Sequence, residues 1–508
     1  MSTYQITIRT EDDELLVEAD SEKTVLEVIQ EAKLVISATC GGNGTCGKCM
    51  VYVHEGGISG LRLACRTHVS DQMIIELAGP QTMIIEEDAL VSSYVPDTGL
   101  TGLGIALDIG TTTLACRLFD RSDGSLLASA ARINPQAVWG ADVISRIDAS
   151  VDGKLEAMQE AVLDAINQMV DELLSTARRR RRDISDFTIA ANTVMQHIAA
   201  GLAPDSIGVN PFTPLSLFGD YHDLPLLNIP CQVWFTPCLA SYVGGDITAG
   251  IIASDMHKAE RKQVLIDLGT NGEMALGDKN GIIACATAAG PVFEGANIHF
   301  GMAALPGAIS VAWEEDGVLK FDTIGGAEPK GLCGTGIIDI AACLYKNGIF
   351  DETGYLYSAD ECPKYADRLG EEDGVSVFYL TEDKSLYLTQ KDIRNIQLGI
   401  SAVYSGLMVL LDTAGIGIDD IDHLDIAGGF GKYINKESAA ILGLFPKAWL
   451  DRTNSIGNSS VEGASAVLLS SAARNDTQNI HDLAEYIELS LSPKFNEYFV
   501  ENMMFPED

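Results

Sequence analysis

Four of the eleven cysteines in this chain fall within one short stretch, and cysteine thiolates are strong metal ligands. Residues 40–49 read Cys-Gly-Gly-Asn-Gly-Thr-Cys-Gly-Lys-Cys, and the next cysteine, Cys65, follows after 15 intervening residues. Three thiolates on one tight loop and a fourth from elsewhere suit a [2Fe–2S] rhombus with two sulfurs on each iron. Glycines let the backbone fold closely around such a cluster and point amide N–H groups toward sulfur. We therefore predict that the cluster is held by Cys40, Cys46, Cys49 and Cys65.

Zinc is the alternative occupant of this loop, because four cysteines that include a C-x2-C pair can also hold a structural metal. The density of glycine in the loop and the short strands predicted around it favour iron–sulfur. The C-x5-C-x2-C spacing is one residue longer than that of plant-type ferredoxins and is similar to that of adrenodoxin-type ones. The interval between Cys49 and the fourth cysteine, Cys65, is shorter than in either group of ferredoxins. The other seven cysteines show no metal-binding spacing and are interpreted as small core residues.

A second set of residues suits phosphate chemistry and occurs twice. Asp108-Ile-Gly-Thr-Thr-Thr113 and Asp267-Leu-Gly-Thr-Asn-Gly272 each follow one apolar run and precede another. A Gly-Thr turn between two strands presents backbone N–H groups and hydroxyls to a phosphate, and the aspartate reaches Mg²⁺, usually through water. Further strand-like and helix-sized segments follow each motif in the same order. A duplicated α/β domain explains this repetition and would set the two loops facing each other.

Hydrophobic periodicity indicates the elements around the cysteine loop. Short strands are predicted at residues 3–10, 14–20, 50–56 and 72–78, with a helix at 24–34 that Asp20 and Ser21 could cap. Hairpin, helix and returning strands make a β-grasp arrangement. Residues 86–102 combine charges, Pro, Ser and Gly without periodicity, which is typical of a linker.

The domain organisation follows from these patterns. We expect a [2Fe–2S] ferredoxin-like domain at residues 1–83, a linker at 84–102 and an ATPase domain at 103–508. The ATPase domain divides into two duplicated halves at about 103–262 and 263–508.

Composition excludes several functional classes. A net charge of −38 over 508 residues argues against a nucleic-acid partner, which needs clustered Lys and Arg. The sequence contains no run of 18 uninterrupted apolar residues, so we expect no membrane partner. Residues 399–418 are expected to form a buried amphipathic helix. The N-terminus lacks the pattern of a signal peptide, so we expect a cytoplasmic location. Without a Walker A loop or a dinucleotide fingerprint, NAD and flavin are not implied.

The ordered motifs resemble those of a known ATPase superfamily. The loops at Asp108 and Asp267 look like the two phosphate motifs of the actin/Hsp70/sugar-kinase superfamily, and Asp425-Ile-Ala-Gly-Gly-Phe-Gly431 resembles its adenosine motif. A ferredoxin loop followed by this core is similar to the reductive activators of corrinoid-dependent methyltransferases. Further family-like stretches are residues 134–136, 140–146, 192–193, 290–295 and 388–394. Longer members carry an additional domain where this chain has a short linker.

The resemblance implies a fold and a role for each motif. The fold would be an α+β β-grasp [2Fe–2S] ferredoxin domain followed by a duplicated α/β actin/Hsp70/sugar-kinase-like ATPase core. Asp108 and Asp267 would serve Mg²⁺ and the attacking water during ATP hydrolysis. The resemblance assigns the phosphates to Thr111, Thr112, Thr270 and Asn271, the adenosine to Gly428 and Gly429, and a further close-approach turn to Gly334. Glu294 and Asn192 are candidate phosphate-side groups, with turn or core roles as the alternative.

The implied activity is ATP-dependent reductive activation of a corrinoid protein from Co(II) to Co(I), with the electron passing through the cluster. The expected partners are a corrinoid protein of a methyltransferase system and an electron-donating reductase or ferredoxin, and pairing of two copies stays open. Three alternatives remain: an ATP-driven electron donor to another low-potential acceptor, a small-molecule kinase with a regulatory cluster, and an Fe–S sensor that binds ATP without turnover. No residues that specify a kinase substrate pocket are evident in the sequence.

Overall fold

Three large sheets organise the chain, and two of them share one strand plan. The computed structural model describes residues 3–10, 14–32, 34, 36, 49–55, 58–77, 93–140, 142–295, 297–315, 317–429 and 433–506. Most of the glycine-rich cysteine loop, with Cys40 and Cys46, lies outside the described residues, as do residues 84–92 of the predicted linker and residues 430–431 of the predicted adenosine motif.

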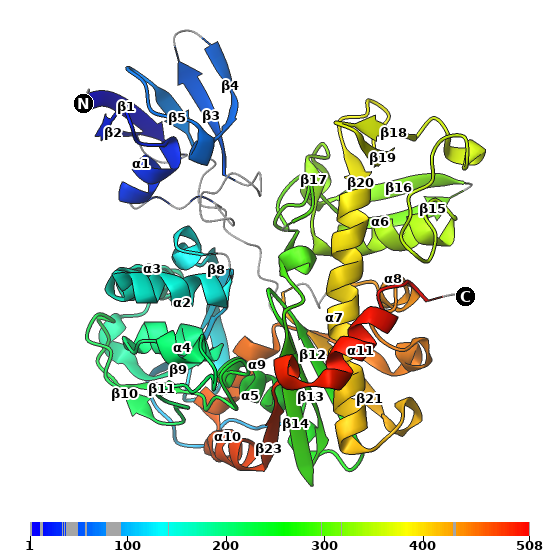
Figure 1. The fold of residues 1–508 in the computed structure, drawn as a ribbon. Coiled ribbons are helices and arrows are strands. Elements are labelled where there is room, and N and C mark those ends of the chain that lie inside the picture. The colour runs from blue at the N-terminus through cyan, green and yellow to red at the C-terminus, as the bar shows by residue number, and fades with distance from the viewer. Residues whose placement is uncertain are drawn as a thin grey trace.

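The N-terminal unit is a five-stranded sheet in the order β2-β1-β5-β3-β4 with one helix packed on it (Figure 1). Its elements are β1 (Thr3–Arg9), β2 (Glu14–Asp20), α1 (Val25–Glu31), β3 (Met50–Glu55), β4 (Ile58–Leu63) and β5 (Ile74–Glu76). This is the predicted β-grasp arrangement. Two details differ from the prediction. Strand β4 was not predicted, and α1 is capped by Thr24 rather than by Asp20 or Ser21, because Thr24 and Glu27 form a reciprocal capping box.

The first half of the predicted ATPase core is built on a six-stranded sheet in the order β10-β11-β9-β6-β7-β8. Its strands are β6 (Leu103–Ile109), β7 (Thr113–Asp120), β8 (Ser125–Ile133), β9 (Ile184–Ala191), β10 (Tyr221–His222) and β11 (Val233–Phe235). Its helices are α2 (Val143–Ala149), α3 (Leu155–Ala177), α4 (Thr193–Ala200) and α5 (Gly245–Ala253). Helix α3 presents apolar residues such as Val162, Ile166 and Met169 to the sheet, and their burial supplies the core of this half.

The second half is built on a six-stranded sheet in the order β22-β21-β12-β13-β14-β23, with two small three-stranded sheets inserted. Its strands are β12 (Gln263–Leu268), β13 (Gly272–Asp278), β14 (Gly281–Thr287), β15 (Ala308–Glu315), β16 (Val318–Thr323), β17 (Gly331–Leu332), β18 (Leu369–Glu372), β19 (Val375–Tyr379), β20 (Tyr387–Thr389), β21 (His423–Ala427), β22 (Thr453–Gly457) and β23 (Ala484–Ile487). Its helices are α6 (Gly334–Lys346), α7 (Gln390–Ala414), α8 (Lys436–Ile441), α9 (Ser459–Leu469), α10 (Ser471–Leu483) and α11 (Pro493–Glu501).

The two large sheets confirm the predicted duplication. Strand β6 is antiparallel to β7 and parallel to β9, and β12 is antiparallel to β13 and parallel to β21 in the same way. The third strand of each half, β8 or β14, then pairs antiparallel with the second. Each motif aspartate therefore lies at the end of an inner strand, flanked by equivalent neighbours.

Helices α5 and α9 pack against each other between the two large sheets (Figure 1). The packing is close because both helices use small residues at the crossing. A Cβ added to Gly463 of α9 would lie 1.9 Å from the carbonyl oxygen of Ala249 in α5, so a side chain there would force the helices apart. Helix α9 also contacts β6 and β9 of the first half, although it lies near the end of the chain.

Helix α7 is the buried helix that the sequence predicts at residues 399–418, but it begins nine residues earlier. Thr389 caps it in a reciprocal capping box with Asp392, and it ends where Gly415 adopts a φ of +67°. Of the helices described, it is the one that is long and apolar enough to cross a membrane by length and composition. In the structure 72% of that apolar window is buried, against β13, β14 and α11.

The last part of the predicted linker is attached to the ATPase core. Ser93 Oγ donates to Asp255 Oδ1 over 2.8 Å, and the Tyr94 hydroxyl donates to Asp476 Oδ2 over 2.5 Å. Residues 93 and 94 have the composition of a linker, but their side chains bind α10 and the segment before β12. The N-terminal unit also contacts the first half, where Gln30 Nε2 donates to the carbonyl of Val138 over 3.4 Å.

Candidate functional site

Asp108 and Asp267 lie at equivalent positions near the ends of β6 and β12, and both are held by the first residues of α9. Asn458 Nδ2 donates to Asp108 Oδ2 over 2.8 Å, and Ser460 Oγ donates to Asp108 Oδ1 over 2.9 Å. Ser459 Oγ reaches Asp267 Oδ2 at 3.5 Å. Because residues 458–460 are consecutive, one helix start brings the carboxylates of the two halves together. Asp108 is 8% exposed, so its charge has little contact with solvent.

The two predicted phosphate loops, at residues 108–113 and 267–272, also meet through their threonines. Thr112 Oγ1 and Thr270 Oγ1 are 3.2 Å apart, although they come from different sheets. Both hydroxyls donate to Glu294 Oε2, over 2.8 Å and 3.0 Å. Glu294 ends a short 3-10 helix, Pro291–Glu294. The three side chains therefore form a small polar cluster between the halves.

Two polar side chains of the family-like stretches, Asn134 and Arg146, contact the first predicted phosphate loop, and a third, Gln136, binds Arg146. Asn134 Nδ2 donates to the Gly110 carbonyl over 2.8 Å, and a guanidinium N–H of Arg146 donates to the Thr111 carbonyl over 2.5 Å. Gln136 accepts a further bond from Arg146 over 3.2 Å. Arg146 is fully buried, and this burial lowers its pKa to about 9. The loop conformation at residues 110–112 is thus determined by the segment that follows β8.

Two further carboxylates surround the motif aspartates. Asp246 lies in the first turn of α5, and Glu273 lies on β13, where it accepts from Asn192 Nδ2 of the first half over 2.8 Å. Burial raises the pKa of Asp108 to about 6, and burial together with the charge of Asp108 raises that of Asp267 to about 7. Burial and the neighbouring carboxylates also raise the pKa of Asp246 and Glu273. We call Asp108, Asp246, Asp267 and Glu273 the carboxylate cluster.

The carboxylate cluster suits Mg²⁺ together with a nucleotide. Magnesium in phosphoryl-transfer sites takes one or two protein carboxylates and completes its shell with water and phosphate oxygens. Within the described residues, no group of three or more His, Cys, Asp or Glu side chains converges closely enough to hold a metal ion by itself. A cation would relieve the repulsion that raises these pKa values, and the phosphates would supply the remaining ligands.

The raised pKa values predict a specific pH dependence of stability. A carboxyl group that keeps its proton to higher pH in the folded state makes the protein less stable as pH rises from about 4 through the raised pKa. Asp246→Asn removes one charge of the cluster. We expect it to raise the melting temperature at pH 8 by roughly 2–4 °C, the shift that about 1 kcal/mol produces in a domain of 150–250 residues.

At pH 5 the same variant should melt close to the unmodified protein, because Asp246 is then already neutral. The exposed Asp148 of α2 provides a matched control, since Asp148→Asn should change neither melting temperature by a comparable amount. An equal shift at both pH values would show that repulsion within the carboxylate cluster is not its cause. Thermal unfolding in magnesium-free buffer measures these differences.

The predicted nucleotide residues occupy different settings. Gly428, at φ +98°, packs against the second phosphate loop, where an added Cβ would lie 2.4 Å from the Leu268 carbonyl and 2.8 Å from Asp267 Oδ1. Close packing within the protein therefore requires glycine at position 428, because a larger residue would collide with the loop at Asp267. Gly429 next to it is exposed, with nothing within 4 Å of an added Cβ. The Asn271 side chain lies near Glu273, where it acts to lower the pKa of that carboxyl group against the larger effect of burial.

Gly334 is the first residue of helix α6, and within the described part of the chain no hydrogen bond links it to Thr112, Thr270, Glu294 or the carboxylate cluster. Its neighbours fix that helix start against β15. Thr335 Oγ1 donates to the Ser310 carbonyl over 2.7 Å, and a Cβ on Gly336 would lie 2.1 Å from the Ile309 carbonyl. The glycines of this turn therefore permit a close approach between α6 and β15.

The cysteine site is described in part, through Cys49 and Cys65. Cys49 precedes β3 and Cys65 follows β4, and the hairpin register that pairs Met50 with Leu63 brings the two cysteines together. The backbone N–H of Cys65 donates to Cys49 Sγ over 3.5 Å. Such N–H···S bonds stabilise a thiolate that ligates iron. Cys49 is 1% exposed, which would shield a bound cluster on this side from water.

The remaining cysteines divide into two groups. Cys116, Cys238, Cys285 and Cys333 are buried, as predicted for core residues. Cys231, Cys343 and Cys362 are only partly buried, although Cys231 and Cys362 still pack against the hydrophobic cores of the two halves.

Sequence reasoning missed several residues of the site. Asp246, Glu273, Asn458, Ser459 and Ser460 were not among the predicted site residues. The Gly-Gly-Asp run at 244–246 and the Asn-Ser-Ser run at 458–460 are recognisable as helix starts. Their participation depends on α5 and α9 meeting between the sheets, which no local pattern reveals.

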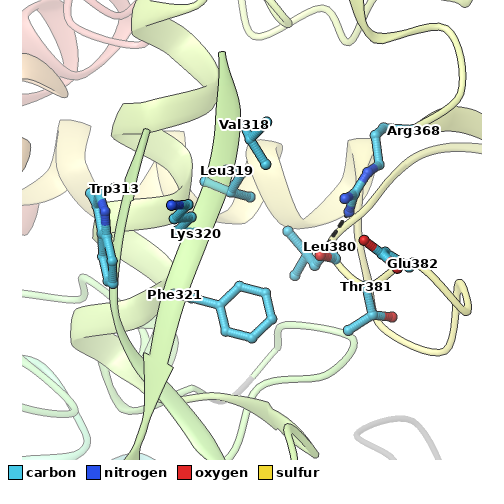
Figure 2. Close-up of a pocket in the computed structure, with 9 residues that line it drawn as sticks. All are labelled: Trp313, Val318, Leu319, Lys320, Phe321, Arg368, Leu380, Thr381 and Glu382. Carbon is cyan, nitrogen blue, oxygen red and sulfur yellow. Dashed lines mark hydrogen bonds between the residues drawn. The ribbon is translucent and has the colours of Figure 1, made fainter. Parts of the chain in front are cut away.

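Two surface cavities lie apart from these clusters. One, of about 420 Å³, is formed by the β15–β16 hairpin and the chain near Leu380 (Figure 2). Its wall includes the aromatic rings of Trp313 and Phe321, and Arg368 donates to the Leu380 carbonyl at its edge over 3.0 Å. The other, of about 510 Å³, lies beside the C-terminal end of α9, where Arg121 and Arg474 both bind Asp186. No predicted site residue lines either cavity.

Comparison with known proteins identifies each part of the chain. Residues 261–508 match a family model described as the C-terminal domain of RACo, the ASKHA domain, and residues 103–259 match the RACo middle region. Residues 8–70 match the 2Fe-2S iron-sulfur cluster binding domain. Together with the duplicated sheets, these matches define an iron–sulfur protein with an actin/Hsp70/sugar-kinase-type core.

Two curated relatives and one solved structure specify the family. The corrinoid activation enzyme RamQ of Eubacterium limosum is 30% identical, over 97% of this chain and 98% of the relative. The Co(II) methylated amine-specific corrinoid protein reductase of Methanosarcina barkeri is 24% identical, over 78% of this chain and 76% of the relative. A solved structure of a reductive activator for corrinoid, iron-sulfur protein covers 99% of this chain and 98% of its own at 29% identity, with a TM-score of 0.72. The chain belongs to this family of RACo- and RamQ-type activators.

Proposed function

We propose that this chain catalyses the ATP-dependent reductive activation of a corrinoid protein, from Co(II) to Co(I). The observation that carries the proposal is the alignment with RamQ, which spans 98% of that corrinoid activation enzyme and so includes both the iron–sulfur and the ATPase parts. The meeting of Asp108 with Asp267 and of Cys49 with Cys65 supports it independently.

The iron–sulfur part would supply single electrons. We propose that Cys40, Cys46, Cys49 and Cys65 hold a [2Fe–2S] cluster, which transfers one electron at a time when bound. Plant-type centres have potentials near −400 mV. Reduction of Co(II) corrinoid to the Co(I) nucleophile requires a still lower potential, so the transfer is uphill. Nucleotide binding or hydrolysis must therefore change the complex or the cobalt ligation, and closure of two lobes on ATP can do so.

The ATPase part would bind Mg²⁺ and the nucleotide between the two halves. We propose that Asp108 and Asp267 hold Mg²⁺ and orient the attacking water, and that Thr111, Thr112, Thr270 and Asn271 contact the phosphates. Gly428 and Gly429 would border the adenosine, and Gly334 would bring α6 close to it. The division into residues 1–83, 84–102 and 103–508 follows the same assignment. We propose a cytoplasmic location, with a reductase or ferredoxin as the electron donor and pairing of two copies left open.

An anaerobic assay with a corrinoid protein tests this function. With a chemical reductant, Mg²⁺ and ATP present, we expect the Co(I) absorbance band to appear and ATP turnover to rise when the corrinoid protein is added. Leaving out ATP should abolish the Co(I) band, because the electron transfer is then uphill.

Two controls separate the alternatives. A non-hydrolysable ATP analogue distinguishes nucleotide binding from hydrolysis as the driving event. Equal Co(I) formation with and without ATP would contradict the proposal. Phosphorylation of an added small molecule would instead favour a kinase, and ATP binding without turnover under all conditions would favour a sensor.

A further inference from the structure

Glu294 joins the two phosphate loops through a single oxygen atom. Thr112 of the first half and Thr270 of the second half both donate to Glu294 Oε2, over 2.8 Å and 3.0 Å. The two hydroxyl oxygens are 3.2 Å from each other. Thr270 is 5% exposed and Glu294 is partly buried, so the contacts are only weakly screened by water. The carboxylate thus links a loop of the first half to a loop of the second.

A nucleotide phosphate would need the same two donors. Carboxylate and phosphate oxygens are both anionic acceptors that form strong hydrogen bonds with hydroxyls. A threonine hydroxyl has one hydrogen to donate, so neither Thr112 nor Thr270 can donate to Glu294 and to a phosphate at once. A phosphate placed beside the Glu294 carboxylate would also be repelled by its charge. Glu294 and the nucleotide therefore compete for one position.

Three groups near Glu294 would suit a phosphate as well as a carboxylate: the hydroxyls of Thr112 and Thr270 and the guanidinium of Arg146. Arg146 lies behind the first phosphate loop, fully buried and bound to the Thr111 carbonyl. Burial raises the pKa of Glu294 and outweighs the two threonine hydrogen bonds and the charge of Arg146, which act in the opposite direction. A phosphate that replaced the carboxylate would gain the same two hydroxyls and the same cation.

We propose that Glu294 is a latch that substitutes for a nucleotide phosphate: it holds the two phosphate loops together, and ATP binds by displacing it. This inference rests on the proposed ATP site between the halves. The 3-10 helix that Glu294 ends packs against α6 and α7, two helices of the second half. Displacement of Glu294 by a phosphate would therefore release a segment that contacts both helices. Phosphate binding could in this way change how α6 and α7 pack in the second half.

Variants at Glu294 test the latch through the sign of a change in affinity. Calorimetry on the full chain with Mg²⁺ would compare ATP and adenosine. We expect Glu294→Ala to bind ATP about 10-fold more tightly, because the apparent affinity rises with the fraction of protein whose loops are free to bind. Glu294→Gln keeps the shape but loses the charge, and should give a smaller increase. Adenosine carries no phosphate, and its affinity should stay unchanged in both variants.

Glu382→Ala is the matched control, because Glu382 is an exposed glutamate at the separate cavity of Figure 2 and should leave ATP affinity unchanged. Weaker ATP binding by the Glu294 variants would overturn the latch and make Glu294 a ligand of the nucleotide or its metal. Equal tightening for adenosine would also overturn it. Absence of ATP binding by the unmodified chain would instead refute the proposed function. If Glu294→Ala fails to fold, Glu294→Gln decides the question alone.

Discussion

Asp267→Asn should lower ATP hydrolysis by about 10²-fold or more, the loss seen when a positioned polar group is removed from a site of this kind. Asparagine keeps the volume of the side chain, and its oxygen can still accept from Ser459, so the fold should be maintained. What disappears is the negative charge beside Asp108, where the attacking water and Mg²⁺ are proposed to lie. We expect ATP still to bind and the cluster still to accept an electron from a chemical reductant. The ATPase rate and the Co(I) band, measured on one preparation, should fall together if hydrolysis drives the electron transfer.

Asp278→Asn is a suitable control for this variant. Asp278 is also buried and lies on β13, the strand paired with β12, but at the opposite end from Asp267, where it forms an ion pair with Lys262 at 3.2 Å. Loss of this ion pair in Asp278→Asn should change the melting temperature more than the ATPase rate. A stably folded Asp267→Asn variant with a normal ATPase rate would remove this carboxylate from the mechanism. If Asp267→Asn lowers the melting temperature but leaves the ATPase rate per folded molecule normal, Asp267 only maintains the conformation of the loop.

Cys49→Ser should abolish Co(I) formation, the second large effect that we expect. The unmodified protein, purified anaerobically, should be brown-red and contain about two irons per chain. In the variant both the colour and the iron should be lost, because serine replaces a ligand in the cysteine site at the start of β3. ATP turnover without the corrinoid protein should persist, since the carboxylate cluster belongs to other sheets. Iron analysis, visible absorbance and the Co(I) band measure the three outcomes.

Cys362→Ser provides the matched control, because Cys362 is partly buried and far along the chain from the cysteine loop. It should retain iron, colour and Co(I) formation. Stoichiometric zinc without visible absorbance in the unmodified protein would contradict the [2Fe–2S] assignment. Retention of the full absorbance spectrum by Cys49→Ser would remove Cys49 from the ligand set.

The parts of this protein that the sequence could predict depend on neighbours along the chain. The duplicated strand order and the position of Asp108 and Asp267 at strand ends follow from apolar runs broken by Gly-Thr turns. The β-grasp unit follows from short alternating strands around one helix. In each case the residues that set the conformation lie within a few positions of each other, so local patterns carry the information.

The tertiary structure decided which distant side chains meet. Asn458 lies 350 positions from Asp108 in the chain, yet it donates to that carboxylate because α9 packs between the two sheets. Glu294 reaches Thr112 across 182 positions for a related reason, since the two halves face each other at the phosphate loops. The sequence alone determined the two kinds of chemistry in this chain, iron–sulfur and phosphate. The polar contacts that position the phosphate loops depend on how the two halves pack, and packing between distant segments leaves no periodic signal in either segment.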